Sequence, residues 1–262
     1  MAGRGLRRGV VKPAIATALS VLAVLATGCQ SQPTGPRGGP LLTATLASEG
    51  PLAARVGVLL LPDQGDARSC TASVVHSPGG DLLATAAHCV YRTGIGPVAD
   101  LAFEPGFRDG NAPGGGWVVD RITVDQRWRE DGDPEYDVAF VTVRDTGGRH
   151  LEDVVGGGNA LGVNRGFGLP VTVTGYPFDH DEPITCSTRT TAQSSTQQRF
   201  DCGGFSDGTS GSPWLTGIDP ATGLGTLVGV IGGYQAGGDT PDTSYSVSFD
   251  DRVAALYAQA TA

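Results

Sequence analysis

Short apolar runs separated by turn residues form the main pattern of the chain. Val56 to Leu61 is a continuous apolar run closed by Pro62-Asp63, which is typical of a buried strand. Thr71 to Val75 and Leu82 to Ala86 flank Ser77 to Asp81, a Pro- and Gly-rich stretch that indicates a hairpin turn. This part of the chain therefore predicts β-structure.

Further runs of similar length recur downstream. They lie at Trp117–Val124, Val138–Val143, Val171–Thr174, Arg199–Cys202, Leu227–Ile231 and Ser244–Phe249. The 262 residues include 41 Gly and 17 Pro, which favours many turns over long helices. Strands this short, joined by so many turns, predict an all-β sandwich or barrel.

The last segment has a helical period instead. Asp250 or Asp251 can cap a helix in which Val253, Leu256 and Tyr257 share one face. We expect one C-terminal helix that docks on the β-structure.

The N-terminus has the pattern of an export signal. Ala14 to Ala26 is a small, apolar run of about 20 Å as a helix, too short to span a bilayer comfortably. A basic head precedes it, formed by Arg4, Arg7, Arg8 and Lys12. The run ends in Leu25 to Cys29, which resembles a bacterial lipobox whose cysteine takes a diacylglycerol.

We therefore expect residues 1–28 to be a lipoprotein signal peptide and Cys29 to carry the lipid. The protein would then be exported and held at the extracellular face of the cell membrane. An ordinary signal peptide with an incidental cysteine, giving a fully secreted protein, stays open. Residues 29–51, rich in Pro, Gly, Ser and Thr, are expected to form a disordered tether.

The charge balance bears on partners. The chain has 18 basic and 27 acidic residues, a formal charge of −9. Phosphate binding needs clustered Lys and Arg, so a nucleic acid is not expected as a partner. The acidity fits a solvated surface, and we expect a monomer.

Five cysteines are an odd number. If Cys29 is lipidated, four remain for an oxidising compartment, and four allow three disulfide connectivities. Zinc is the competing use of cysteine beside histidine, but the sequence has no C-x-x-C pair and no suitably spaced second His. We expect neither a metal nor an organic cofactor.

Three short segments, in order, resemble the chymotrypsin/trypsin-like serine peptidase family. Thr85 to Cys89 reads T-A-A-H-C, Tyr136 to Phe140 contains D-V-A-F, and Asp207 to Pro213 reads D-G-T-S-G-S-P. The order His, Asp, Ser is that of this family and differs from the order in subtilisins and α/β-hydrolases. The Ser-Gly-Ser-Pro ending is similar to the V8-like glutamyl endopeptidases. The resemblance covers about residues 52–258.

The resemblance implies a catalytic triad of His88, Asp137 and Ser210. A serine hydroxyl is a poor nucleophile, so Ser210 needs His88 as a base, and Asp137 would fix the imidazole tautomer. The backbone N–H groups of Gly208 and Ser210 would form the oxyanion hole. The implied fold is two packed six-stranded antiparallel β-barrels with a C-terminal α-helix.

The family's domain plan places His88 and Asp137 in an N-terminal barrel, residues 52–155. Ser210 and the terminal helix would lie in a second barrel, residues 156–262, with the boundary at Gly156 to Gly158. The resemblance also implies the disulfides Cys70–Cys89 and Cys186–Cys202.

The residues expected in the specificity pocket differ from those of trypsin and of the glutamyl endopeptidases. By offset from Ser210, Gly204 and Phe205 would form its base, and Ile231, Gly232 and Gly233 part of one wall. No Asp stands where trypsin needs one, and Ile231 stands where glutamyl endopeptidases carry a His. A small or apolar residue at the cleavage site is expected.

Two other features of the family motif are missing. Thr209 replaces the Asp that pairs with a new N-terminal amine, so activation by N-terminal insertion is not expected. The serine of the wall strand that braces the triad Asp is also absent, with Ile231 or Gly232 in its place.

The expected function is an exported serine endopeptidase that acts on protein or peptide substrates through an acyl-enzyme. Two alternatives stay open. One is a catalytically silent binding module on the same scaffold, and the other is a serine esterase that uses the same triad.

Overall fold

The computed structural model describes residues 41–65 and 67–262. The predicted signal peptide, Cys29 and residues 29–40 of the predicted tether lie outside the described residues. Within the described residues, no helix is long and apolar enough to cross a membrane.

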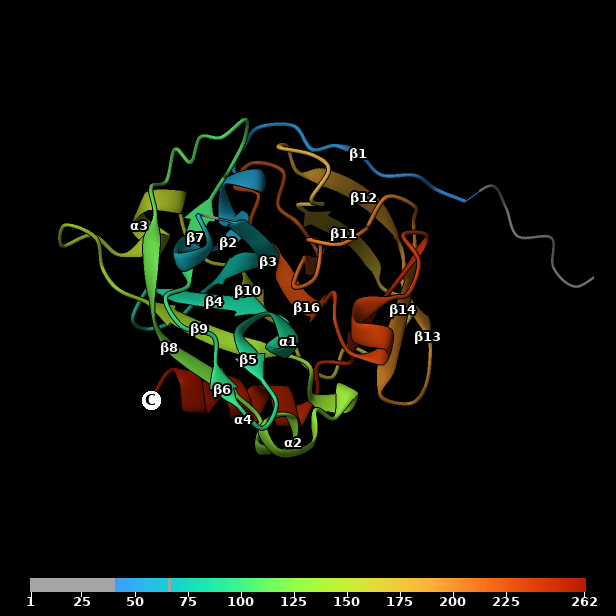
Figure 1. The fold of residues 1–262 in the computed structure, drawn as a ribbon. Helices are drawn as coiled ribbons and strands as arrows, with labels where there is room; N and C mark the ends of the chain where they lie inside the picture. The colour runs from blue at the N-terminus through green and yellow to red at the C-terminus, as the bar shows by residue number, and fades with distance from the viewer. Residues whose placement is uncertain (1–40, 66) are drawn as a thin grey trace, which may run out of the picture. The chain divides into compact units, whose positions relative to one another are not determined.

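Six strands of the N-terminal half close into an antiparallel barrel (Figure 1). They are β2 (Val56–Leu61), β3 (Ala67–Val75), β4 (Leu82–Thr85), β7 (Ala102–Pro105), β8 (Trp117–Val124) and β9 (Ala139–Val143). Around the barrel the strands follow the order β2-β3-β4-β9-β8-β7. A small hairpin, β5 (Tyr91–Arg92) with β6 (Gly96–Pro97), stands outside it.

Strand β2 explains why its sequence is apolar without alternation. Leu59 belongs to the core of the first barrel, whereas Val58 and Leu60 pack with Tyr176 from the second half of the chain. Both faces of β2 are therefore buried, one inside the barrel and one between the barrels. At Gly57 a Cβ atom would lie 2.1 Å from the carbonyl oxygen of Glu104, so only glycine lets β2 approach β7 this closely.

The C-terminal half forms two sheets around a second core of Val173, Phe200, Trp214 and Val228. The larger sheet has the order β1-β12-β11-β15-β16-β10, and the smaller one β13-β14-β17. Their bounds are β1 (Thr45–Leu46), β10 (Ala160–Leu161), β11 (Pro170–Gly175), β12 (Ile184–Arg189), β13 (Thr191–Ala192), β14 (Gln197–Asp201), β15 (Pro213–Thr216), β16 (Thr226–Val230) and β17 (Thr243–Val247). Every pairing is antiparallel except β10 with β16.

The predicted fold class, an all-β trypsin-like fold with a C-terminal helix, is confirmed. The strands of the first barrel form one closed, hydrogen-bonded sheet. The strands of the second barrel are divided between two separate sheets.

The helices are short, and only the last one was expected. They are α1 (Ala87–Val90), α2 (Gln126–Asp131), α3 (Leu151–Val155) and α4 (Asp251–Ala260). Single 3-10 turns lie at η1 (Ala53–Arg55), η2 (Pro62–Gln64), η3 (Pro134–Tyr136) and η4 (Tyr234–Gly237). Asp250 caps α4 by accepting a bond from the Arg252 amide at 2.9 Å, and Leu256 is buried in the core that both barrels share.

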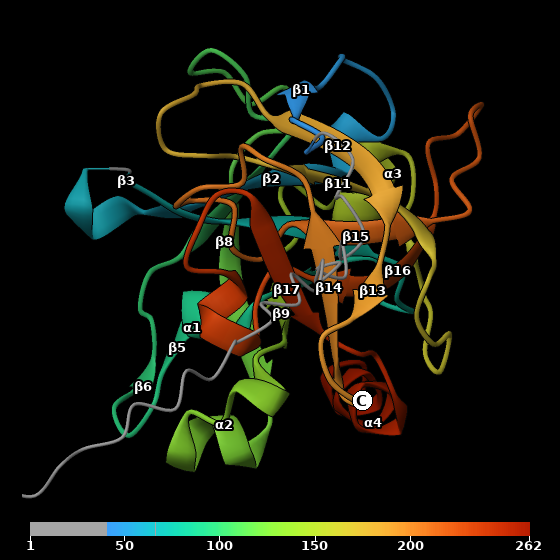
Figure 2. The same cartoon turned by 90° about the vertical axis from the view of Figure 1, so that its right-hand side faces the viewer.

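The described end of the predicted tether is ordered. β1 pairs antiparallel with β12, and Figure 2 shows the two side by side. The Ala44 amide also donates to the carbonyl of Gly203 at 2.8 Å, and the Gly203 amide donates to the carbonyl of Leu42 at 2.7 Å. The expectation of disorder is therefore wrong for residues 42–47, because the edge of β12 and the backbone of Gly203 supply partners that their composition does not reveal.

Candidate active site

His88 lies in α1, directly after β4. Its neighbour Cys89 forms a disulfide with Cys70 on β3, with the two Cα atoms 6.0 Å apart. This bond fixes the short helix to the barrel wall, so the position of the imidazole is set by two strands. In Figure 1, α1 lies between the two barrels.

Asp137 follows the 3-10 turn η3 and precedes β9. The Asp133 side chain caps that turn by accepting a bond from the Glu135 amide at 3.0 Å. Asp137 itself is 1% exposed. A buried carboxylate is costly unless hydrogen-bond donors surround it.

The donors to Asp137 come from both barrels. Its Oδ1 accepts the His88 amide at 2.9 Å, and its Oδ2 accepts the His88 Nδ1 at 2.8 Å. The Gly233 amide, from the second half of the chain, also donates to Oδ2 at 2.8 Å. The bond at Nδ1 leaves Nε2 of His88 free to act as a base toward the cleft.

This pairing shifts the titration of the imidazole. Burial alone would lower the pKa of His88, but the charge of Asp137 and its hydrogen bond outweigh that effect, so the pKa is raised. The protonated form is therefore stabilised where a general base must hold a proton.

Ser210 lies in the loop between β14 and β15, and the first barrel holds that loop. Thr71 on β3 donates twice to it, from its amide to the Ser210 carbonyl at 2.8 Å and from its hydroxyl to the Gly208 carbonyl at 3.0 Å. Thr71 was not singled out from the sequence, because a threonine in a strand carries no signal of this role.

The amides of Gly208 and Ser210 remain without acceptors among the described residues. Gly208 has a φ of +96°, and a Cβ there would lie 2.5 Å from the Tyr176 carbonyl oxygen. Only glycine fits this conformation and this space. Two free, neighbouring N–H groups can bind an anionic oxygen.

His88 and Ser210 line one cavity of about 490 Å³. Within the described residues no hydrogen bond joins the His88 ring to Ser210. Such bonds are often long in unliganded enzymes and tighten when substrate binds.

The five predicted pocket residues divide into two groups. Phe205 and Ile231 line the cavity, but Gly204, Gly232 and Gly233 do not. A Cβ at Gly204 would face Ala44 at 3.3 Å, and one at Gly232 would face the Asp137 carbonyl oxygen at 3.0 Å. Gly204, predicted for the base, and Gly232 and Gly233, predicted for the wall, therefore do not line this cavity.

The opposite side of the cavity is made by residues 235–241. Gln235 and Ala236 have φ of +52° and +51°, so the chain turns left-handed after Gly233 and does not continue as a strand. Offsets from Ser210 could not reveal this turn. Asp207 and Asp239, both exposed, also line the cavity, and no Lys or Arg does so among the described residues.

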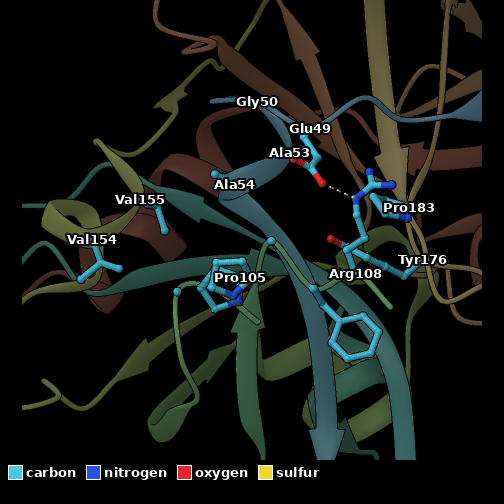
Figure 3. Close-up of a pocket in the computed structure, with 14 residues that line it drawn as sticks. Glu49, Gly50, Ala53, Ala54, Pro105, Arg108, Val154, Val155, Tyr176 and Pro183 are labelled. Carbon is cyan, nitrogen blue, oxygen red and sulfur yellow. Dashed lines mark ion pairs between the residues drawn. The ribbon is translucent and has the colours of Figure 1, made fainter. Parts of the chain in front are cut away.

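A second cavity of about 400 Å³ lies beside η1 and β7 (Figure 3). Arg108 is its main charged group, and that guanidinium is occupied by Glu182 and the Ala47 carbonyl, with Glu49 4.0 Å away. It contains no nucleophile next to a base, so it does not compete as an active site.

The two predicted disulfides, Cys70–Cys89 and Cys186–Cys202, are both present. Cys70, His88 and Cys89 are the sole grouping of potential metal ligands in the described part of the chain. The disulfide removes the thiolates that would bind a metal. Disulfides are typical of proteins that fold outside the reducing cytosol.

No family model matches the sequence, and no curated protein matches it. Several solved structures do match the chain in fold. Protease Anisep from Arthrobacter nicotinovorans matches with a TM-score of 0.70 and 24% identity, over 81% of this chain and 97% of that one. The thermostable serine protease AL20 from an extremophilic microorganism matches with a TM-score of 0.71 and 25% identity, over 81% and 99%.

A Glu endopeptidase, solved in complex with MPD, matches with a TM-score of 0.68 and 19% identity, over 84% of this chain and 97% of that one. The described domain therefore has the fold of the trypsin-like serine proteases, as the sequence motifs suggested. At these identities the likeness supports a serine protease, and the roles of single residues are argued from the site itself.

Proposed function

We propose that this protein is an exported serine endopeptidase that cleaves peptide bonds with Ser210 as nucleophile, His88 as general base and Asp137 as the group that orients His88. The observation that carries the proposal is the buried Asp137 bonded to His88 Nδ1 at 2.8 Å, with His88 and Ser210 lining one cavity.

The chemistry follows from these positions. Nε2 of His88 takes the hydroxyl proton while Ser210 Oγ attacks the carbonyl carbon, and the new oxyanion is bound by the Gly208 and Ser210 amides. His88 then gives the proton to the leaving amine, which leaves an acyl-enzyme. Water, activated by the same imidazole, releases the acid and restores Ser210.

The cavity favours some substrates over others. Phe205 and Ile231 are 5% and 3% exposed and offer apolar contacts, whereas Asp207 and Asp239 repel anions. We expect cleavage after small or apolar residues and rejection of Glu or Asp, although one structural neighbour is a Glu endopeptidase.

A fluorophosphonate probe tests the nucleophile. The wild-type protein should be labelled, and Ser210→Ala and His88→Ala should not. Ser212→Ala is the matched control, because Ser212 is a buried serine of the same loop that donates to the Thr209 carbonyl at 2.6 Å. Labelling that persists in Ser210→Ala would contradict the proposal by placing the nucleophile elsewhere. Wild-type protein that never labels would also contradict it and leave a silent binding module.

Peptide-library cleavage then separates an endopeptidase from an esterase. Anchoring needs its own test, because Cys29 lies outside the described residues. We propose a lipid on Cys29, so Cys29→Ala should release the protein to the medium. Unchanged membrane retention would overturn the anchor without touching the enzyme assignment.

A further inference from the structure

The wall strand carries no serine beside Asp137, as the sequence already showed, with Ile231 and Gly232 at the positions concerned. In its place the Gly233 amide donates to Asp137 Oδ2 at 2.8 Å. This backbone bond joins the second half of the chain to the carboxylate of the first barrel. A peptide N–H can serve in this way only if the wall segment is held firmly in place.

Gln197, the first residue of β14, holds that segment. Its side-chain Oε1 accepts the Tyr234 amide at 3.2 Å, and the next amide back along the chain is the one that reaches Asp137. A Cβ on Gly233 would lie 2.4 Å from the same Oε1, so the wall peptide lies directly on the Gln197 side chain.

The other end of Gln197 binds the segment that carries Asp137. Nε2 donates to the Pro134 carbonyl at 3.1 Å and to Glu135 Oε1 at 3.3 Å, both in η3. Gln197 is 2% exposed, so water does not substitute for these bonds. The Nε2 of Gln197 lies against two acceptors, and its Oε1 lies against a donor. A primary amide can bond to both, whereas a carboxylate has no N–H to donate.

We propose that Gln197 is a positioning residue of the active site, which aligns the His88–Asp137 pair across the two barrels. It does so by fixing the Gly233 amide on Asp137. The inference rests on the proposed function, because its effect is measured on the reaction.

Gln197→Met tests the proposal, since methionine has a similar length and neither set of bonds. Loosening the Gly233 bond removes one of the N–H donors that balance the charge of the Asp137 carboxylate, so that charge attracts protonated His88 more strongly. The acid limb of kcat/KM should therefore move up by about half a pH unit. Misalignment should lower kcat about tenfold, with KM little changed.

Gln198→Met is the matched control. Gln198 is equally buried on the same strand, but its Nε2 donates at 2.7 Å to the Val228 carbonyl, away from Asp137. This variant should lose stability yet keep the acid limb and kcat of wild type. The downfield proton signal of His88 Nδ1–H gives a second readout, and it should move in Gln197→Met alone.

If Gln197→Met does not fold, Gln197→Leu applies the same test, because leucine also lacks the acceptor for Tyr234 and the donor to Pro134 and adds no charge beside Asp137. An acid limb and Nδ1–H signal unchanged from wild type, in an active and folded Gln197 variant, would overturn the inference. Equal effects of the Gln197 and Gln198 substitutions would also overturn it. A wild-type protein with no activity would instead contradict the proposed function.

Discussion

At the scale of single residues, the candidate catalytic side chains could be picked out from sequence motifs, and the groups that contact them could not. His88 and Asp137 are bonded as the motif implies. Thr71 and the Gly233 amide hold the nucleophile loop and the carboxylate, and neither belongs to a motif. A backbone N–H exists at every residue but proline, so its role depends on where the fold brings it.

The pH dependence tests the His88–Asp137 pair. Catalysis needs neutral His88, so its raised pKa should place the acid limb of kcat/KM above about pH 6.5, the ordinary value for histidine. Asp137→Asn removes the charge that raises this pKa, so the acid limb should fall, and kcat should drop about 10⁴-fold because the tautomer is no longer fixed.

Asp120→Asn is the control for this measurement, because Asp120 is exposed and pairs with Arg144 on the surface of the first barrel. Its acid limb should match wild type. The same pair affects stability: its contribution is complete below about pH 6.5 and is lost as the pH rises through the raised pKa of folded His88. An acid limb that Asp137→Asn leaves in place would contradict the pairing.

At the scale of elements, apolar runs predicted strands well where one or both faces are buried. The run Val56 to Leu61 is β2 to the residue, and Trp117 to Val124 is β8. Strand β12, with the sequence Ile-Thr-Cys-Ser-Thr-Arg, was not predicted. Its outward residues are polar, and one of its two partner strands, β1, lies far away in the sequence, so the tertiary context decides its structure.

The lining of the specificity pocket is a second feature that the sequence alone did not predict. Counting from Ser210 assumes that the wall continues as a strand, but positive φ angles at Gln235 and Ala236 turn it away. Neither residue type favours this conformation, so their sequence gives no warning. Local motifs therefore predicted that His88 and Asp137 lie together, whereas offsets along the chain did not predict which residues line the cavity.

The N-terminal strand β1 gives a prediction at this scale. A chain that begins at residue 48 loses the Ala44 and Leu42 bonds to Gly203 and the Ala47 amide bond to the Pro183 carbonyl, all at 2.7–2.8 Å. At about 1 kcal/mol each, the free energy of unfolding should fall by about 3 kcal/mol. Gly203 directly precedes Gly204 and Phe205, so kcat/KM should fall as well.

Urea unfolding of this chain and of one that begins at residue 41 measures the effect. The longer chain keeps every bond just named and should match the full-length protein. If both truncated chains unfold at the same urea concentration, β1 is an accessory strand and contributes nothing to the fold.

At the scale of the whole molecule, one buried arginine joins segments that are far apart in the sequence, at the link between the two barrels. Arg55, in η1, is 2% exposed and has no carboxylate partner in the described part of the chain. It donates instead to four carbonyl oxygens, those of Pro51, Gly156, Gly157 and Thr222. These belong to the N-terminal segment, to the link between the barrels and to a loop of the second barrel.

Burial lowers the pKa of Arg55, yet a guanidinium remains charged at neutral pH. The four carbonyl oxygens therefore replace water as the partners of the buried cation. They are themselves satisfied by its N–H groups. Arg55→Met should leave several of them unsatisfied and lower the free energy of unfolding by about 3 kcal/mol or more.

Arg189→Met is the matched comparison, because Arg189 is exposed and donates to the Gly168 carbonyl alone, at 2.7 Å. It should change stability by less than about 0.5 kcal/mol. The proposed catalytic groups come from different barrels, so loosening the link at Arg55 should also reduce kcat in molecules that remain folded. Full stability and full kcat in Arg55→Met would mean that the interface around Tyr176 and β2 sets the geometry of the cleft without this residue.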